Sequence, residues 1–434
     1  MELYMQRDKT IQDVLDEGSG EVSLKGWIFR IRDTKNIVFI VLRDTTNILQ
    51  CVVKKDNVDE ETFEKASDQQ IEASIKVKGE LEEDERAPTG YELKVSDLEV
   101  VGESHNFPIQ KDQSKELLLD KRHLWLRSRK MNAILKIRST VFEAIHEYFR
   151  ENDFYEFHAP IFQSTQSEGG SEIFSVDYFD DEVFLAQTWQ LPAEAGIFSL
   201  ENIYTIAPSF RAENSKTSRH LTEYWHAEME QAWANFDDII EHGERLLKHI
   251  VTKVLEKNSD ELEILERDPD KLKPTIENEF EQITYTEAID ILKDDMDVEW
   301  GEDLGIEEER HLTNKYDTPL IVTNYPKEVK AFYMKINPDN PKTVFGCDFL
   351  APEGYGEIIG GSQREEDIEE IKERLEEDGE DPEEYQYYLD TRRYGSVPHG
   401  GFGMGVERVI RWITDQHDIK DTIPFPRTPR RHYP

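Results

Sequence analysis

Two arginines in the middle of the chain stand in a pattern suited to binding phosphate. Arg211 ends an extended apolar run, Arg219 lies in the polar loop that follows, and a second extended run returns from Tyr224. The planar, permanently charged guanidinium group can bond two phosphate oxygens at once. The predicted hairpin carries these polar and aromatic groups: Arg211, Glu213, Arg219, His220, Tyr224, Trp225, Glu228 and Glu230. A surface hairpin held together by ion pairs would look the same, so this segment alone leaves both interpretations open.

A glycine-rich segment near the C-terminus indicates a second phosphate site. In HGGFGMGVERVIRWITD, Gly401, Gly403 and Gly405 lie on an expected strand that runs directly into a helix opened by Glu407 and Arg408. Glycines let a ligand lie against the backbone, and the start of a helix favours anions. Joints of this kind are common, so the signal is weak by itself.

A third segment, CDFLAPEGYGEIIGGSQRE, offers carboxylates for a hard cation. Asp348 and Glu357 could hold Mg²⁺, which prefers one or two carboxylates together with phosphate oxygens. A solvated acidic strand is the alternative interpretation of the same residues.

Strand patterns dominate the first hundred residues. Residues 71–77 alternate apolar and polar side chains, as a half-buried strand does. The five predicted strands are 22–33, 37–43, 47–53, 71–79 and 91–101. Five short antiparallel strands suit a small closed barrel of the oligonucleotide/oligosaccharide-binding (OB) type, although a barrel without any ligand fits the pattern equally well.

The rest of the chain predicts an α+β domain. From Met131, apolar residues recur at steps of three and four and predict a buried-face helix of about 20 residues that ends near Asn152. Extended segments follow, including 330–336, with helices near 236–257 and after Gln363. Because regular strand–helix alternation is missing, we expect a mainly antiparallel sheet flanked by helices.

Length and composition narrow the class of protein. The 434 residues predict two or three domains, and 37% hydrophobic content is enough for packed cores. No apolar run is long enough for a membrane span, and the N-terminus lacks a secretory signal pattern, so we expect a soluble, cytoplasmic chain. Cys51 and Cys347 stand alone and are expected in the core. The formal charge of −41 by itself argues against nucleic-acid binding, because phosphates bind positive side chains. Since this charge is spread along the whole chain, it suggests a halophilic protein in a high-salt cytoplasm.

Taken together, these motifs resemble those of the class II aminoacyl-tRNA synthetases. FRAENSKTSRHLTEYWHAEME is similar to motif 2, GFGMGVERVIRWI to motif 3, and the helix and strand from Met131 to Pro160 to motif 1. The barrel indicates the aspartyl/asparaginyl/lysyl subgroup. Five segments, two of which overlap motifs 2 and 3, are most similar to its asparaginyl members: ENSKTSRHLTEYW, VTNYPKEVKAFYMKINPD, GEIIGGSQRE, RRYGSVPHGGFGMG and IPFPRTPR.

The resemblance implies a role for each candidate residue. Arg211 would contact the α-phosphate of ATP, Arg408 the γ-phosphate, and Tyr224 would stack on adenine. The full implied ATP set is Arg211, Glu213, Arg219, His220, Leu221, Tyr224, Glu357, Gly405 and Arg408, with Arg211 and Arg408 catalytic. The implied amino-acid set is Glu168, Gln190, Glu228 and Arg364, and the implied magnesium ligands are Glu357 and Asp348. In the barrel, Arg32, Phe39 and Gln50 match the residues with which the family reads the anticodon.

The function implied is ATP-dependent ligation of L-asparagine to tRNA(Asn) through an asparaginyl adenylate. The implied enzyme is a homodimer formed through the motif 1 region, and it uses neither DNA nor a membrane. The expected division is an anticodon-binding domain over 1–103, a linker over 104–130 and a catalytic domain over 131–434. Asparagine is favoured over aspartate because Ala193 stands where aspartyl enzymes carry a lysine. The alternatives are an aspartyl enzyme, an ammonia-dependent asparagine synthetase, which would lack the barrel, and an inactive RNA-binding paralogue.

Overall fold

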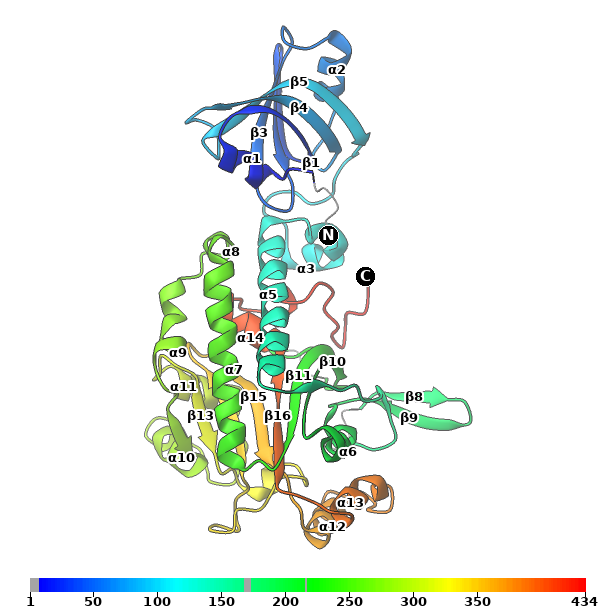
Figure 1. Ribbon diagram of the computed structural model, residues 1–434, viewed down its shortest axis with the longest axis vertical. Coiled ribbons are helices and arrows are strands. Elements are labelled where there is room, and N and C mark those ends of the chain that lie inside the picture. The colour runs from blue at the N-terminus through cyan, green and yellow to red at the C-terminus, as the bar shows by residue number, and fades with distance from the viewer. Residues whose placement is uncertain (1–7, 168–172, 215–216) are drawn as a thin grey trace. The chain divides into compact units, whose positions relative to one another are not determined.

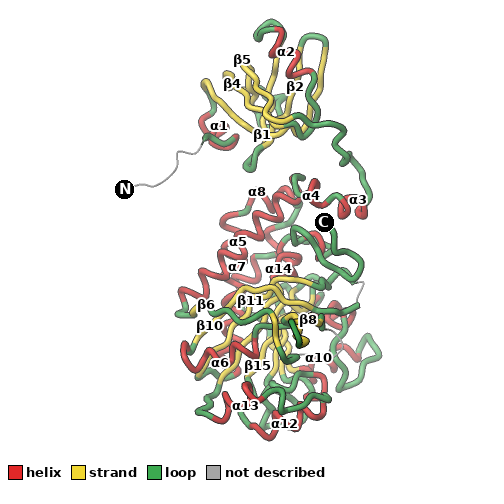
Figure 2. The backbone as a smooth tube through the Cα atoms, turned by 90° about the vertical axis from the view of Figure 1, so that its right-hand side faces the viewer, coloured by secondary structure: helices red, strands yellow, loops and turns green. Residues whose placement is uncertain are grey.

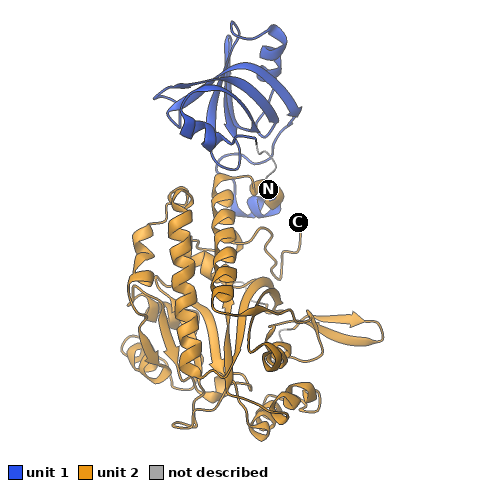
Figure 3. Ribbon diagram, viewed as in Figure 1, with its two compact units in different colours: residues 1–121 blue, residues 122–434 orange. Residues whose placement is uncertain are grey.

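The computed structural model describes residues 8–167, 173–214 and 217–434, and it divides the chain into two compact units. The units are Met1–Lys121 and Arg122–Pro434, so the division falls inside the predicted linker 104–130 (Figure 3). None of the described helices is both long enough and apolar enough to cross a membrane.

The first unit contains a closed five-stranded barrel with strand order β1-β2-β3-β5-β4. Its strands and helices are β1 (Gly20–Thr34), β2 (Ile37–Arg43), β3 (Ile48–Lys54), β4 (Ser74–Glu83), β5 (Tyr91–Gly102), α1 (Ile11–Glu17), α2 (Glu60–Ser67) and α3 (Lys115–Asp120). Alternate residues of each strand fill the barrel: Val38, Ile40 and Leu42 on β2 are fully buried. The predicted barrel is therefore confirmed.

Two details of the barrel prediction are wrong. β3 and β5 pair in parallel, whereas we expected antiparallel strands throughout. The fourth strand begins at Ser74 rather than at residue 71, because Glu72 has a positive φ of 68° and turns the chain before the strand starts.

The second unit is built on an eight-stranded sheet with order β12-β13-β14-β15-β16-β11-β10-β6 (Figure 1). Only β12–β13 and β10–β6, at the two ends of the sheet, pair in parallel, so the expected mainly antiparallel sheet is confirmed. The strands are β6 (Tyr155–Glu156), β10 (Asn202–Phe210), β11 (Glu223–Ala232), β12 (Gln282–Thr284), β13 (Leu320–Thr323), β14 (Gly346–Ala351), β15 (Gly356–Gln363) and β16 (His399–Gly405). A separate three-stranded sheet contains β7 (Phe162–Gln163), β8 (Ser175–Tyr178) and β9 (Asp181–Leu185), and its β8–β9 hairpin projects from the unit.

Two long helices, α5 and α7, lie side by side against one face of this sheet (Figures 1 and 2). The Ser128 side chain caps α5 (Arg129–Glu151) by accepting a hydrogen bond from the Met131 amide, and the Asn235 side chain caps α7 (Phe236–Lys257) in the same way. Their apolar faces share one core with β11, β14, β15 and β16. The other helices are α4 (Arg122–Trp125), α6 (Gln190–Leu200), α8 (Ser259–Ile264), α9 (Lys273–Glu277), α10 (Tyr285–Lys293), α11 (Ile306–Thr313), α12 (Ile368–Glu377), α13 (Gln386–Arg393), α14 (Val406–Ile413) and the short 3₁₀ helices η1 (Pro269–Lys271), η2 (Lys327–Val329) and η3 (Ile419–Asp421).

The strand expected over 330–336 is absent. That segment forms turns and two isolated bridges, Met334 with Arg364 and Ile336 with Val344. Its apolar residues pack against α12 and α13 instead: Phe332 and Tyr333 are buried in a cluster with Ile371, Leu375 and Tyr388. Both cysteines are buried, as expected.

Candidate active site

The β10–β11 hairpin carries one side of the site. Ser209 pairs with Tyr224 near the loop end of the hairpin, and the pairing continues beyond the strands, where the Arg211 amide donates to the Thr222 carbonyl. Because side chains alternate along a strand, Tyr224, His226 and Glu228 extend from the same face of β11. The Arg211 guanidinium lies 6.0 Å from the centre of the Tyr224 ring. The hairpin thus brings a cation and an aromatic ring together beside the sheet.

The other side of the site comes from β15, β16 and α14. Arg408, in the first turn of α14, donates from Nη1 to a Glu357 carboxylate oxygen at 2.8 Å and to the Glu357 carbonyl at 3.2 Å. Gly403 faces Glu228 across the β11–β16 pair, and a Cβ at this position would overlap the His226 ring. The glycine therefore keeps this part of the sheet surface open.

One pocket gathers all nine residues expected to bind ATP. Its lining contains Arg211, Glu213, Arg219, His220, Leu221, Tyr224, Glu357, Gly405 and Arg408, together with His226, Ile358, Gly403, Glu407 and Ile419. Burial and the charges of Arg408, Arg219 and Arg211 lower the pKa of His220 to about 4. The imidazole is neutral at physiological pH, so arginines supply the positive charge of this pocket.

Arg219 is fixed by a residue that the sequence analysis did not identify. Its guanidinium is buried and forms an ion pair with Glu309 of α11, and the same carboxylate accepts from the Glu357 amide at 3.1 Å. Gly356 has a φ of 76°, and a Cβ there would overlap both members of the pair. No sequence signal links Glu309 to Arg219, because the two are 90 residues apart.

A second pocket adjoins the first and shares four residues with it. Arg211, His226, Glu357 and Gly403 line both. The lining of the second pocket also includes three of the four residues expected to bind an amino acid, Gln190, Glu228 and Arg364, with Thr188, Lys330, Tyr333 and Asp348. The fourth, Glu168, lies outside the described residues. A ligand in each pocket would therefore meet the other beside Arg211.

The polar groups of the second pocket are held by hydrogen bonds. Glu228 accepts from the Trp189 amide at 2.9 Å and from the Thr188 hydroxyl. Arg364 donates to both oxygens of Glu230 and, at 2.6 Å, to the Ser362 hydroxyl. Ala193 packs among apolar side chains of α6 and β10 and is not one of the residues that line the pocket.

The carboxylates of Asp348 and Glu357, the expected magnesium ligands, both lie close to Gly360. A Cβ on Gly360 would lie 3.4 Å from an Asp348 oxygen and 3.5 Å from a Glu357 oxygen. Lys330, another residue that the sequence analysis missed, donates to Asp348 at 2.7 Å. Burial opposes ionisation of Glu357, but Arg408, Lys330 and Arg211 together lower its pKa to about 2, so the carboxylate is charged.

The barrel has its own surface pocket, which brings the three expected anticodon residues together. Arg32, Phe39 and Gln50 line it with Arg30, Ile31, Val41, Asp84, Arg86 and Glu92. Arg32 pairs with Phe39 across β1 and β2, and its guanidinium lies 4.9 Å from the ring centre. Phe39 is on the outer face of the barrel, since its neighbours Val38 and Ile40 fill the interior.

Comparisons with known proteins match both units. Residues 114–429 match the family of class II tRNA synthetases (D, K and N), and residues 22–101 match the OB-fold nucleic acid binding domain. Asparagine–tRNA ligases from Thermoplasma acidophilum and Thermococcus kodakarensis are 47% and 46% identical, over 95% and 97% of this chain and 96% and 98% of theirs. The crystal structure of asparaginyl-tRNA synthetase from Pyrococcus horikoshii complexed with asparaginyl-adenylate is 46% identical, with a TM-score of 0.95 over 99% of this chain and 100% of that one.

Proposed function

The chain belongs to the class II tRNA synthetases of the D, K and N group, and from this membership we propose that it ligates L-asparagine to tRNA(Asn) using ATP. The carboxylate of asparagine attacks the α-phosphate of ATP, which releases pyrophosphate and leaves asparaginyl adenylate. The 3′-terminal ribose of the tRNA then takes the asparaginyl group, and AMP leaves.

The observation that carries this proposal is the shared wall of the two pockets. Arg211 lines both, so a carboxylate in one and an α-phosphate in the other would meet beside its guanidinium. Negative charge builds on the phosphate oxygens as the new bond forms, and a fixed cation stabilises that charge. No side-chain nucleophile is needed, because orientation and charge neutralisation lower the barrier.

The other residues of the ATP pocket take roles consistent with their surroundings. We assign Arg408 to the γ-phosphate, Tyr224 to stacking on adenine, and Glu213 to the adenine amino group. Arg219 and His220 face the outer phosphates, Arg219 held by Glu309 and His220 uncharged. Leu221 and Gly405 complete the wall of the pocket.

The residues around Glu357 fit Mg²⁺, which when bound would neutralise charge on the phosphates. In the described parts of the chain, no group of three or more His, Cys, Asp or Glu side chains could hold a metal alone. This finding agrees with a Mg²⁺ site in which the protein supplies one or two carboxylates and the phosphates of ATP supply the other ligands. We propose Glu357 as the main ligand and Asp348, already beside the Lys330 ammonium, as the second.

Selectivity for asparagine follows from the charges in the amino-acid pocket. Arg364 would donate to the side-chain carbonyl oxygen, but Glu230 offsets its charge, so little net attraction remains for the carboxylate of aspartate. Glu228 would accept from the amide NH₂ of asparagine and repel a carboxylate. Gln190 and Glu168 would bind the α-ammonium group. This distribution of charge favours asparagine over the aspartyl alternative.

The barrel is proposed to bind the anticodon. Phe39 would stack on an unpaired base, Arg32 would contact the same strand, and Gln50 can both donate to and accept from a base edge. We propose 1–103 as this anticodon-binding domain, 104–130 as the linker and 131–434 as the catalytic domain. By resemblance, the enzyme would work in the cytoplasm as a homodimer formed through the motif 1 region, without DNA.

The test is amino-acid-dependent exchange of pyrophosphate into ATP by the purified chain. Asparagine should support exchange with a kcat/KM at least about 100-fold above that of aspartate, as expected where a site hydrogen-bonds the correct group. Equal values for the two amino acids would favour the aspartyl alternative. Absence of exchange with either would favour the inactive RNA-binding paralogue.

A further inference from the structure

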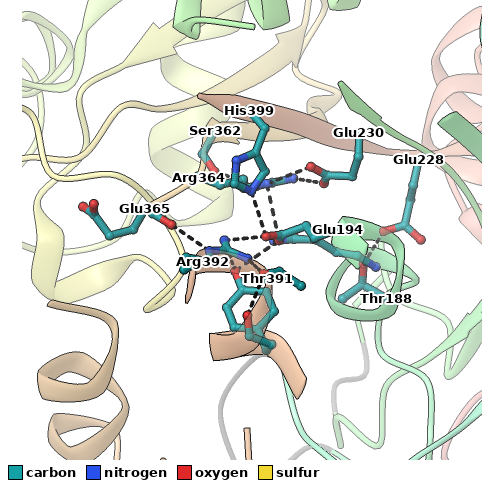
Figure 4. A network of polar contacts seen from close by, with 12 residues as sticks. Thr188, Glu194, Glu228, Glu230, Ser362, Arg364, Glu365, Thr391, Arg392 and His399 are labelled. Atoms are coloured by element: carbon teal, nitrogen blue, oxygen red, sulfur yellow. Dashed lines mark hydrogen bonds and ion pairs between the residues drawn. The ribbon is translucent and has the colours of Figure 1, made fainter. Parts of the chain in front are cut away.

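Glu194 is a fully buried carboxylate on α6 at the back of the amino-acid pocket. One of its oxygens accepts from the Gln190 side-chain amide at 2.9 Å and from the Tyr388 hydroxyl at 3.2 Å. The other accepts from Arg392 and lies 3.2 Å from His399 Nε2. Figure 4 shows Glu194 beside Arg392, His399 and Arg364. Four neighbours therefore use the hydrogen-bonding capacity of this one carboxylate.

The first consequence concerns the orientation of Gln190. An ionised carboxylate can only accept hydrogen bonds, so the NH₂ group of Gln190 must face Glu194. The carbonyl oxygen of Gln190 then lies on the other side of the amide, toward the pocket that Gln190 lines. A carbonyl oxygen that faces the pocket suits an ammonium group, whereas an NH₂ group there would repel one.

The second consequence concerns Arg364. Arg364 donates hydrogen bonds to Glu230 and Ser362. A Glu194 oxygen lies 3.9 Å from Arg364 Nε and adds a second negative charge beside the guanidinium. Arg392 and His399 contact the other oxygen of the Glu194 carboxylate. His399 Nδ1 lies 2.7 Å from the Val397 carbonyl, so both ring nitrogens of His399 face oxygen atoms. Glu194 is thus the carboxylate that lies between two arginines, Arg364 and Arg392.

We propose that Glu194 is a positioning residue for the amino-acid substrate: it orients the Gln190 amide toward the α-ammonium group and holds Arg364 in place for the side chain. This inference rests on the proposed function. Burying a carboxylate is costly even when it is paired, and a purely packing role at this site would be filled by an apolar side chain. The charge is needed because only an acceptor without protons imposes one orientation on Gln190.

The test uses Glu194→Gln, Gln190→Glu and the double variant in which the two side chains are exchanged. A glutamine at position 194 can donate, so Gln190 loses its fixed orientation. A glutamate at position 190 places two carboxylates face to face. In the double variant, a donor at position 194 again faces an acceptor at position 190, and a carboxylate oxygen faces the pocket. Glu261→Gln is the matched control, because Glu261 is also buried and paired but lies on α8.

Pyrophosphate exchange should show the KM for asparagine raised at least tenfold in each single variant, with the KM for ATP within twofold of wild type. The exchanged double variant should recover at least half of that loss on a logarithmic scale. Glu261→Gln should lower the melting temperature without changing either KM. If Glu194→Gln alone does not fold, Gln190→Glu and the double variant still test the recovery.

The inference is wrong if Glu194→Gln keeps the wild-type KM for asparagine. It is also wrong if the two substitutions are additive, or if the KM values for asparagine and ATP rise together. These results are distinct from failure of the proposed function, in which the wild-type chain itself shows no asparagine-dependent exchange.

Discussion

Arg211 and Arg408 line the same pocket, and we propose that both contact the phosphates of ATP. Both line the pocket, and neither belongs to the buried apolar core. We expect Arg211→Ala and Arg408→Ala each to lower asparagine-dependent pyrophosphate exchange by about 100- to 1,000-fold, because a lost charge-stabilising donor costs about 3–4 kcal/mol in the transition state. Arg245→Ala, which removes an exposed arginine of α7, is the control. Near-normal exchange by either variant with an unchanged circular dichroism spectrum would contradict the assignment.

Glu228 provides the most direct test of selectivity between the two amino acids. Glu228→Gln keeps the shape of the side chain, and its remaining oxygen can still accept from the Trp189 amide while the Thr188 hydroxyl rotates to accept from the new NH₂. Removing the negative charge should raise kcat/KM for aspartate relative to asparagine by tenfold or more. The measurement is pyrophosphate exchange with both amino acids. An unchanged ratio would show that Glu228 does not repel aspartate.

Selectivity should also depend on pH through Glu230. Burial raises the pKa of Glu230 to about 7 against the opposing charge of Arg364, and Glu194 and Glu228 add to the rise. Above this pH the ionised carboxylate offsets Arg364, whereas below it the protonated group leaves Arg364 free to attract aspartate. The asparagine/aspartate ratio of kcat/KM should therefore fall several-fold between about pH 8 and about pH 6. Glu230→Gln should abolish this dependence, and a ratio that rises on acidification would contradict it.

At the scale of elements, the two faces of strand β2 have different expected roles: the outer face is proposed to bind tRNA, and the inner face packs in the barrel core. Phe39 lies in the outer pocket, and Ile40 is fully buried in the barrel. Phe39→Ala should raise the KM for tRNA in aminoacylation by about tenfold or more, because base stacking contributes about 1–3 kcal/mol, and should leave pyrophosphate exchange intact. Ile40→Ala should instead destabilise the barrel by about 2–5 kcal/mol. Urea unfolding and aminoacylation kinetics distinguish the two, and equal effects on both quantities would contradict the assignment.

The elements also separate what the sequence predicts from what it does not. Local patterns predict the hairpin of Arg211 and Tyr224, the glycine-rich strand before Arg408 and a long helix from Met131. Each is present, and the helix begins two residues earlier, at Arg129. The parallel pairing of β3 with β5 closes the barrel through contacts between distant strands, so local patterns could not reveal it. The roles of Glu309, Lys330 and Glu194 were not predicted for the same reason. Their respective partners, Arg219, Asp348 and Arg392, are distant in sequence and lie on other elements. Family resemblance supplied the roles of Gln190 and Arg364, which no spacing rule indicates.

At the scale of the whole molecule, we expect the surplus of negative charge to make stability depend on salt. The chain carries 93 Asp and Glu against 52 Lys and Arg. Carboxylate repulsion extends over about 10 Å at about 0.1 M salt and is screened to about 3 Å at molar salt. The melting temperature should therefore be higher in about 2 M KCl than in about 0.1 M KCl, and aminoacylation should persist in the higher salt. An unchanged or lower melting temperature at high salt would contradict the halophilic prediction and leave the enzymatic one intact.

Charging of tRNA tests the central claim most directly, because it needs the barrel and both pockets at once. A transcript of tRNA(Asn) should be incubated with ATP, Mg²⁺ and radiolabelled asparagine or aspartate, and the acid-precipitable label measured. The account predicts that asparagine is esterified to the tRNA and that aspartate gives at most about a hundredth of its kcat/KM. Comparable charging with aspartate, or formation of adenylate without transfer to tRNA, would contradict it.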